Sequence, residues 1–170
     1  MSKINITTKD ITIIAVLSSF LFIQELVLSY LPNIQLTMLL IVLFSKKLGC
    51  IKTILITCVY VILDNIFGGA FNLLFVVFMI IGWSLTPILL NTIFKKVDNN
   101  ILLAVIGILC SFIYSWVLII PGCIVFNTDF ISYLKMDITW EAIMATSSFL
   151  SILLIYDPLS KLFNKIELLK

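Results

Sequence analysis

The chain has 170 residues, of which 62% are hydrophobic and 12% are charged. Soluble domains carry about 25% charged residues, so this composition excludes an ordinary water-soluble fold and predicts an integral membrane protein with one domain, residues 1–170. The net charge of +2 is small, so we do not expect nucleic acid as a partner. All basic residues are lysines; without His and Arg the usual general bases and phosphate clamps are missing, and we expect no enzyme, cofactor or metal site.

Six apolar segments predict an all-α bundle of six transmembrane helices. The first segment stops before Pro32, because the residue before a proline tends to leave a helix. The fourth contains Pro87, where a kink is expected. The fifth ends at Pro121-Gly122 and the sixth begins near Ile138, which leaves a long loop between them. The predicted spans are residues 11–31, 35–45, 51–64, 71–94, 101–120 and 138–156.

The lysines predict the topology. The second segment is the shortest, and alone it falls short of a hydrocarbon core about 30 Å thick, so it either crosses or forms a re-entrant stub. If all six segments cross, ten of the eleven lysines lie on one side and only Lys135 lies on the other. The positive-inside rule favours this arrangement and places both termini in the cytoplasm.

Segments on the other side of the membrane resemble those of a known family. Leu31-Pro32-Asn33-Ile34-Gln35-Leu36-Thr37 forms a turn that enters the short second span, and Leu63-Asp64-Asn65 is followed by Gly68-Gly69. With the chain length and the six spans, these segments resemble the substrate-binding subunit (S component) of energy-coupling factor (ECF) vitamin transporters. The resemblance implies a multi-pass protein of the bacterial cell membrane that binds a vitamin or related micronutrient from outside.

The resemblance also implies two kinds of partner, a shared transmembrane subunit and two cytoplasmic ATPases. The chain itself has no G-x-x-x-x-G-K-[ST] phosphate loop, so we expect it not to hydrolyse ATP. In the family, an Ala-x-x-x-Ala pattern in the first span contacts the shared subunit. Here Ala15 and Ser19 stand four residues apart, with Ser18 beside them. Small residues at this spacing let helices approach closely, either against the shared subunit or within the bundle.

Polar residues near the outer ends of the first two spans are candidate substrate contacts. A carboxylate is costly inside a membrane helix, so Glu25 either faces a cavity, finds a pairing partner, or reaches the nearby interface. Asn33 and Gln35 flank the proline turn, and their amides offer both donors and acceptors to a ligand. Asn33 is also a common turn residue, so Gln35 is the better candidate.

Further candidates follow in the third, fourth, fifth and sixth spans. Three polar residues gather at one outer corner, where they either contact a ligand or cap helix ends. Interfacial tryptophans are usually membrane anchors, but one of them stands next to a carboxylate near the start of the sixth span, an arrangement that suits a ring with a cation or donor. These candidates are Asp64, Asn65, Asn72, Trp116, Trp140 and Glu141.

The rival interpretation is a structural scaffold, because rod-shape-determining membrane proteins have a similar size and six helices. A scaffold needs no polar cavity on the outer side. The concentration of carboxylates and amides there favours capture of a small molecule instead. With several aromatics and no His or Arg, a neutral or cationic ring compound suits the sequence better than a polyphosphate or polycarboxylate.

Overall fold

The computed structural model describes residues 6–68 and 71–165; Lys3, Gly69 and Lys170, which the sequence analysis used, lie outside them. Within the described residues the chain forms six helices and no strand, as predicted. All of these helices except the second are long and apolar enough to cross a bilayer. The helices are α1 (Thr8–Leu28), α2 (Thr37–Leu48), α3 (Cys50–Phe67), α4 (Leu73–Asn91), α5 (Asn100–Phe126) and α6 (Phe130–Lys165).

The outer surface of the bundle is apolar. On α1 alone, the side chains of Val16, Phe20, Ile23 and Val27 are each more than half exposed. A soluble monomer rarely exposes a contiguous apolar surface of this kind, whereas lipid covers it at no cost. Together with the five long apolar helices, this surface indicates a multi-pass membrane protein.

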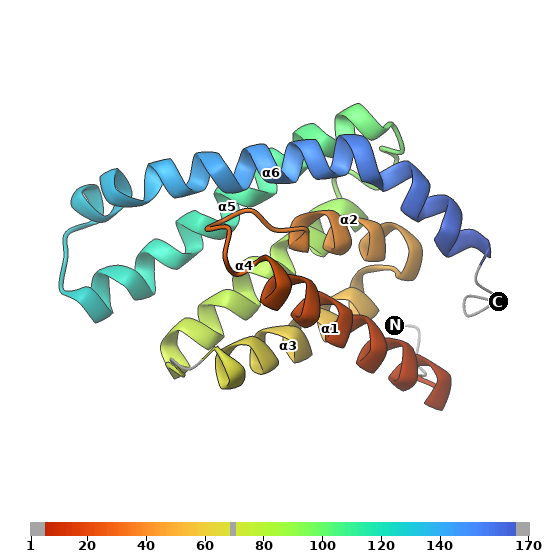
Figure 1. Ribbon diagram of the computed structural model, residues 1–170, viewed down its shortest axis with the longest axis horizontal. Coiled ribbons are helices and arrows are strands. Elements are labelled where there is room, and N and C mark those ends of the chain that lie inside the picture. Colours follow the sequence, from red (N-terminus) through yellow and green to blue (C-terminus); the bar gives the residue numbers. More distant parts are fainter. Residues whose placement is uncertain (1–5, 69–70, 166–170) are drawn as a thin grey trace.

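The short helix α2 lies at the centre of the bundle, and it contacts each of the other five helices (Figure 1). Its 12 residues extend about 18 Å at a rise of about 1.5 Å per residue, less than the bilayer core of about 30 Å. Every residue from Thr37 to Ser45 is buried. A helix that is apolar on all sides belongs inside a protein, so neighbouring helices rather than lipid surround α2.

The prediction of a long loop between the fifth and sixth spans is wrong. Helix α5 continues through Pro121 to Phe126, and α6 begins already at Phe130. Proline inside a helix removes one backbone hydrogen bond and costs about 3 kcal/mol, so close packing must offset it. Here Pro121 and Gly122 are buried, and the ring of Tyr133 lies where a Cβ of Gly122 would be. The contact between α5 and α6 therefore favours helix in both segments.

Helix α6 is also longer than predicted at its other end. It continues past Pro158 to Lys165, and its C-terminal part turns away from the line of the rest (Figure 1). A proline inside a helix is a common cause of such a change in direction. The helix has 36 residues, so it extends beyond the length needed to cross a bilayer.

At one end of the bundle, lysine side chains of α2 form hydrogen bonds to the segment after α4 and to α6. The ammonium of Lys46 donates to the carbonyls of Phe94 and Lys95, at 3.1 Å each. The ammonium of Lys47 donates to the side-chain oxygen of Asn164 at 2.9 Å. These contacts bring together the end of α2, the segment after α4 and the end of α6. We call this the lysine-rich end of the bundle.

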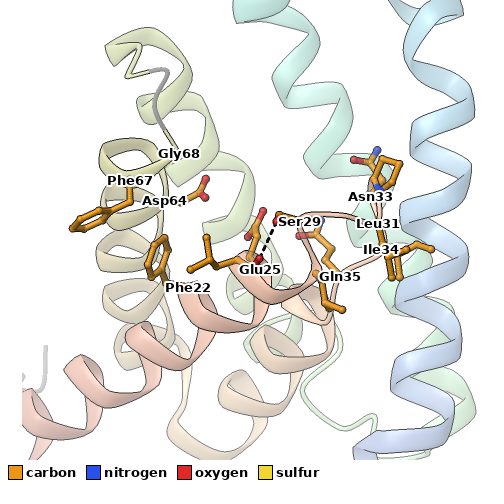
Figure 2. Close-up of a pocket in the computed structure, with 13 residues that line it drawn as sticks. Phe22, Glu25, Ser29, Leu31, Asn33, Ile34, Gln35, Asp64, Phe67 and Gly68 are labelled. Atoms are coloured by element: carbon orange, nitrogen blue, oxygen red, sulfur yellow. Dashed lines mark hydrogen bonds between the residues drawn. The ribbon is translucent and has the colours of Figure 1, made fainter.

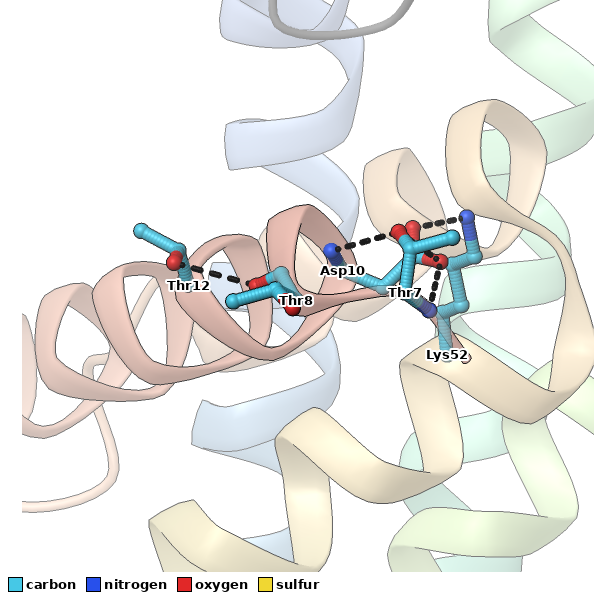
Figure 3. Close-up of polar contacts among 5 residues, drawn as sticks. All are labelled: Thr7, Thr8, Asp10, Thr12 and Lys52. Carbon is cyan, nitrogen blue, oxygen red and sulfur yellow. Dashed lines mark hydrogen bonds and ion pairs between the residues drawn. The ribbon is translucent and has the colours of Figure 1, made fainter. Parts of the chain in front are cut away.

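The starts of α1 and α3 meet at the same end (Figure 3). Thr7 and Asp10 form a capping box, in which each side chain accepts a hydrogen bond from the backbone N–H of the other residue. The second carboxylate oxygen of Asp10 lies 2.5 Å from the ammonium of Lys52, on α3. One carboxylate thus satisfies the start of α1 and fixes it against α3.

Candidate functional site

A cavity of about 280 Å³ opens at the other end of the bundle, between the end of α1, the α1–α2 loop and the end of α3 (Figure 2). Four of the predicted substrate contacts, Glu25, Asn33, Gln35 and Asp64, line it. We call this space the carboxylate cavity. Its lining residues are Phe22, Glu25, Leu26, Leu28, Ser29, Leu31, Pro32, Asn33, Ile34, Gln35, Asp64, Phe67 and Gly68.

Two carboxylates from different helices face the carboxylate cavity. Glu25 projects from α1 and Asp64 from α3, and Figure 2 shows both side chains directed into the space between the two helices. The hydroxyl of Tyr60 donates a hydrogen bond to Glu25. Tyr60 and Asp64 stand one helical turn apart, so they share a face of α3. The side chain of Asp64 has no hydrogen-bond or ion-pair partner among the described residues, so it remains available to a ligand.

The apolar lining of the cavity includes two aromatic rings beside several aliphatic side chains. The rings of Phe22 on α1 and Phe67 on α3 lie with their centroids 5.6 Å apart and their planes tilted by 44°. Aromatic walls with a few convergent polar groups are typical of small-molecule sites. Among the described residues, no group of three His, Cys, Asp or Glu side chains could hold a metal ion. The arrangement therefore suits an organic molecule with a flat apolar part and a polar end.

Gln24 holds the α1–α2 loop in place from inside the bundle. Its amide nitrogen donates to the hydroxyl of Thr37 at 2.7 Å, and its amide oxygen accepts from the backbone N–H of Leu36 at 3.0 Å. Leu36 provides no side-chain cap for α2, so Gln24 supplies the missing acceptor at the start of that helix. The buried amide thereby fixes one wall of the cavity.

The same loop is attached to α6 on its other side. Asn33 has a left-handed backbone (φ 57°), which asparagine tolerates better than most residues. Its amide donates to the carbonyl of Trp140 at 3.0 Å. The hydroxyl of Ser147 accepts from the backbone N–H of Gln35 and donates to its carbonyl, at 3.2 Å each. Residues 31–36 are therefore held between α1 and α6.

Two predicted substrate contacts have structural roles outside the cavity. The amide of Asn65 donates to the carbonyl of Val61 at 2.9 Å and lies 3.4 Å from the sulfur of Met79, so it connects α3 to α4. The side chain of Asn72 accepts from the backbone N–H of Leu74 at 3.0 Å and thus caps the start of α4. Both residues are at the predicted corner, but neither lines the carboxylate cavity.

The predicted aromatic and acidic residues of α5 and α6 also lie elsewhere. Trp140 lines a separate cavity of about 280 Å³ with Tyr133 and Asp137. Glu141 is 2% exposed, and one of its carboxylate oxygens has no partner among the described residues. Trp116 is 56% exposed on α5 and lines neither cavity. The nine predicted substrate contacts thus do not form one site. Four line the carboxylate cavity and Trp140 lines the second cavity, whereas Asn65, Asn72, Trp116 and Glu141 line neither.

The small residues of α1 separate into two groups. Ala15 and Ser19 are exposed on the bundle surface, where the hydroxyl of Ser19 donates to the carbonyl of Ala15 at 2.9 Å. Ser18 is fully buried, and its hydroxyl donates to the carbonyls of Ile14 and Ile56. Ser18 therefore packs against α3 inside the chain and does not belong to the exposed small face.

Sequence reasoning missed the residues that support the site. Gln24 is not among the predicted substrate contacts, yet it fixes the loop. Tyr60 carries the hydrogen bond to Glu25, and its spacing of four from Asp64 was the available signal. Phe22 and Phe67 form the aromatic wall, but an apolar residue in an apolar helix gives no sequence signal of its own.

Neither a scan against models of known protein families nor searches of curated proteins and of solved structures found a match to this chain. The function is therefore inferred from the arrangement of the chain's own residues.

Proposed function

We propose that this chain is the substrate-capture subunit of an importer of the ECF type, and that it binds a vitamin or related micronutrient. The observation that supports the proposal best is the carboxylate cavity, which gathers Glu25, Asn33, Gln35 and Asp64 from two helices and one loop. A membrane scaffold has no need for a cavity with aromatic walls and convergent polar groups. Small-molecule sites have this composition.

The proposal includes a topology with six crossings. The lysine-rich end is cytoplasmic, in accordance with the positive-inside rule, and the carboxylate cavity opens to the outside. Helix α2 crosses inside the bundle, where its neighbours and local thinning of the bilayer accommodate its short length. The bilayer is the cell membrane of a bacterium, as the resemblance to the ECF family implies.

Uptake also needs a contact with the energy-supplying subunits. We assign this contact to the exposed face of α1 around Ala15 and Ser19, because small side chains allow a second helix to approach closely. A bulky residue here should prevent assembly with the shared transmembrane subunit while leaving the distant cavity intact. Ala15→Leu and Ser19→Leu should therefore lose complex formation but keep ligand binding. Complex formation by both variants at the parent level would exclude α1 as the contact.

The capture step can be tested without knowing the ligand. The purified chain in detergent is exposed to the small-molecule fraction of yeast extract, washed, and examined by native mass spectrometry. We expect one added small molecule per chain, which is released on denaturation. A variant with Gln35→Ala and Asp64→Ala should retain far less of it. If the parent chain retains nothing from this mixture, the proposed capture function is wrong.

A further inference from the structure

We infer that the carboxylate cavity binds an organic cation, a ring compound with an amine or a positively charged ring nitrogen. This inference rests on the proposed capture function and specifies the chemical class of its substrate. The side chains that line the cavity include the carboxylates of Glu25 and Asp64, and among the described residues no lysine lines it. The remaining polar groups at the cavity are the uncharged amides of Asn33 and Gln35 and the hydroxyl of Ser29.

Neither carboxyl group at the cavity has a cationic partner among the described residues. Glu25 and Asp64 line the cavity from two different helices, and both are half-buried. The hydroxyl of Tyr60 relieves Glu25 through one hydrogen bond, but a phenol carries no compensating charge. Asp64 has neither a donor nor a cation among the described residues. A carboxyl group partly removed from water either takes up a proton or is stabilised by a cation, and a cationic ligand would supply the partner that the described residues lack.

The two ion pairs among the described side chains lie at the other end of the bundle. Lys52 pairs with Asp10 at 2.5 Å, and Lys46 lies 3.7 Å from Asp98. Both lysines belong to the lysine-rich end, on the far side of the bundle from the cavity. Neither ion pair reaches the carboxylate cavity, so Glu25 and Asp64 have no ion-pair partner among the described residues. A ligand with its own positive charge would supply such a partner.

The lining of the cavity suits an organic cation better than a metal ion. Phe22 and Phe67 line the cavity together with aliphatic side chains such as Leu31, so the apolar part of an organic cation gains contact there. In the part of the chain that the structure describes, no group of three His, Cys, Asp or Glu side chains could hold a metal ion. The cavity volume of about 280 Å³ lies just below the usual range for ligand pockets, roughly 300–1,000 Å³. It suits a compound of one or two rings.

The experiment uses the parent chain and two isosteric variants, Glu25→Gln and Asp64→Asn. Each variant removes one charge and keeps an oxygen that can accept a hydrogen bond. The compound retained from yeast extract is identified by mass spectrometry, and its affinity for each chain is measured by titration calorimetry. We expect a compound that is positively charged at neutral pH. Each variant should bind it about ten- to a hundredfold more weakly, because a charged hydrogen bond is lost.

Asp129→Asn is the matched control. Asp129 lies between α5 and α6, outside the cavity, and its hydrogen bonds with Ser132 hold the pKa of its carboxyl below the usual value. The control therefore removes a negative charge at the cavity end of the bundle without touching the cavity. It should bind like the parent chain. Asparagine also caps helices well, so α6 should remain intact.

The possible outcomes separate the two claims. A retained neutral or anionic compound, or a retained metal ion, would overturn the cation assignment but leave capture of a small molecule standing. Equal weakening by Asp129→Asn and by the cavity variants would also overturn it, because binding would then depend on general surface charge. Retention of no compound by the parent would overturn the capture function and, with it, the assignment of a substrate class.

Discussion

Replacement of Gln24 by Leu should destabilise the fold, because it leaves two polar groups without their hydrogen-bond partner. The change keeps the approximate size of the side chain but removes both hydrogen bonds that attach α1 to the start of α2. The hydroxyl of Thr37 is fully buried and the N–H of Leu36 is half-buried, so water replaces the lost partners poorly. Each orphaned group costs about 1–3 kcal/mol, which gives a loss of about 2–6 kcal/mol for the pair.

The assay is reversible unfolding of the chain in mixed detergent micelles, followed by circular dichroism. Thr12→Val is a matched control on the same helix, because the Thr12 hydroxyl is exposed and donates to the carbonyl of Thr8, within its own helix. The control should change the free energy of unfolding by less than about 0.5 kcal/mol. If Gln24→Leu is as stable as Thr12→Val, the amide does not support the loop, and the described wall of the cavity has another origin.

Three further outcomes follow from other parts of the molecule. Asp10→Lys should lower the midpoint of thermal unfolding, and the swapped double variant with Lys52→Asp should recover part of the loss; no recovery would show that the ion pair does not couple α1 to α3. Gly122→Ala should cost about 1–3 kcal/mol, because the new methyl group meets the ring of Tyr133; unchanged stability would contradict the close contact of α5 with α6. In a cysteine-free background, Lys96→Cys should resist a membrane-impermeant thiol reagent in intact cells, and rapid labelling would exclude the proposed topology.

Composition and periodicity were sufficient to predict an all-helical chain, because few charged residues leave lipid as the suitable solvent. The ends of helices were less predictable. The fifth span was predicted to end before Pro121 and the sixth at residue 156, yet Pro121 and Pro158 both lie inside long helices. The sequence around a proline indicates what the proline costs a helix, but it does not show the packing between helices that offsets this cost. For Pro121 this packing depends on Tyr133, which stands on the next helix.

The candidate site was predicted in part for a similar reason. Polar residues in apolar spans stand out in a sequence, and Glu25 and Asp64 do line one cavity. Sequence alone does not show which way a residue faces on a helix whose neighbours are unknown. Asn72 therefore turned out to cap α4, and Glu141 to lie buried in the bundle. The positions of these residues depend on contacts between helices that are far apart in the chain.

The most direct test of the proposed capture function is protection of the cavity by its ligand. In a cysteine-free background, Ser29→Cys places a thiol in the cavity lining, and Ser132→Cys places one on the exposed start of α6 as a control. The compound retained from yeast extract is added at about ten times its Kd, which should slow maleimide labelling at position 29 roughly tenfold and leave position 132 unchanged. Equal labelling at position 29 with and without the compound would contradict binding in the carboxylate cavity.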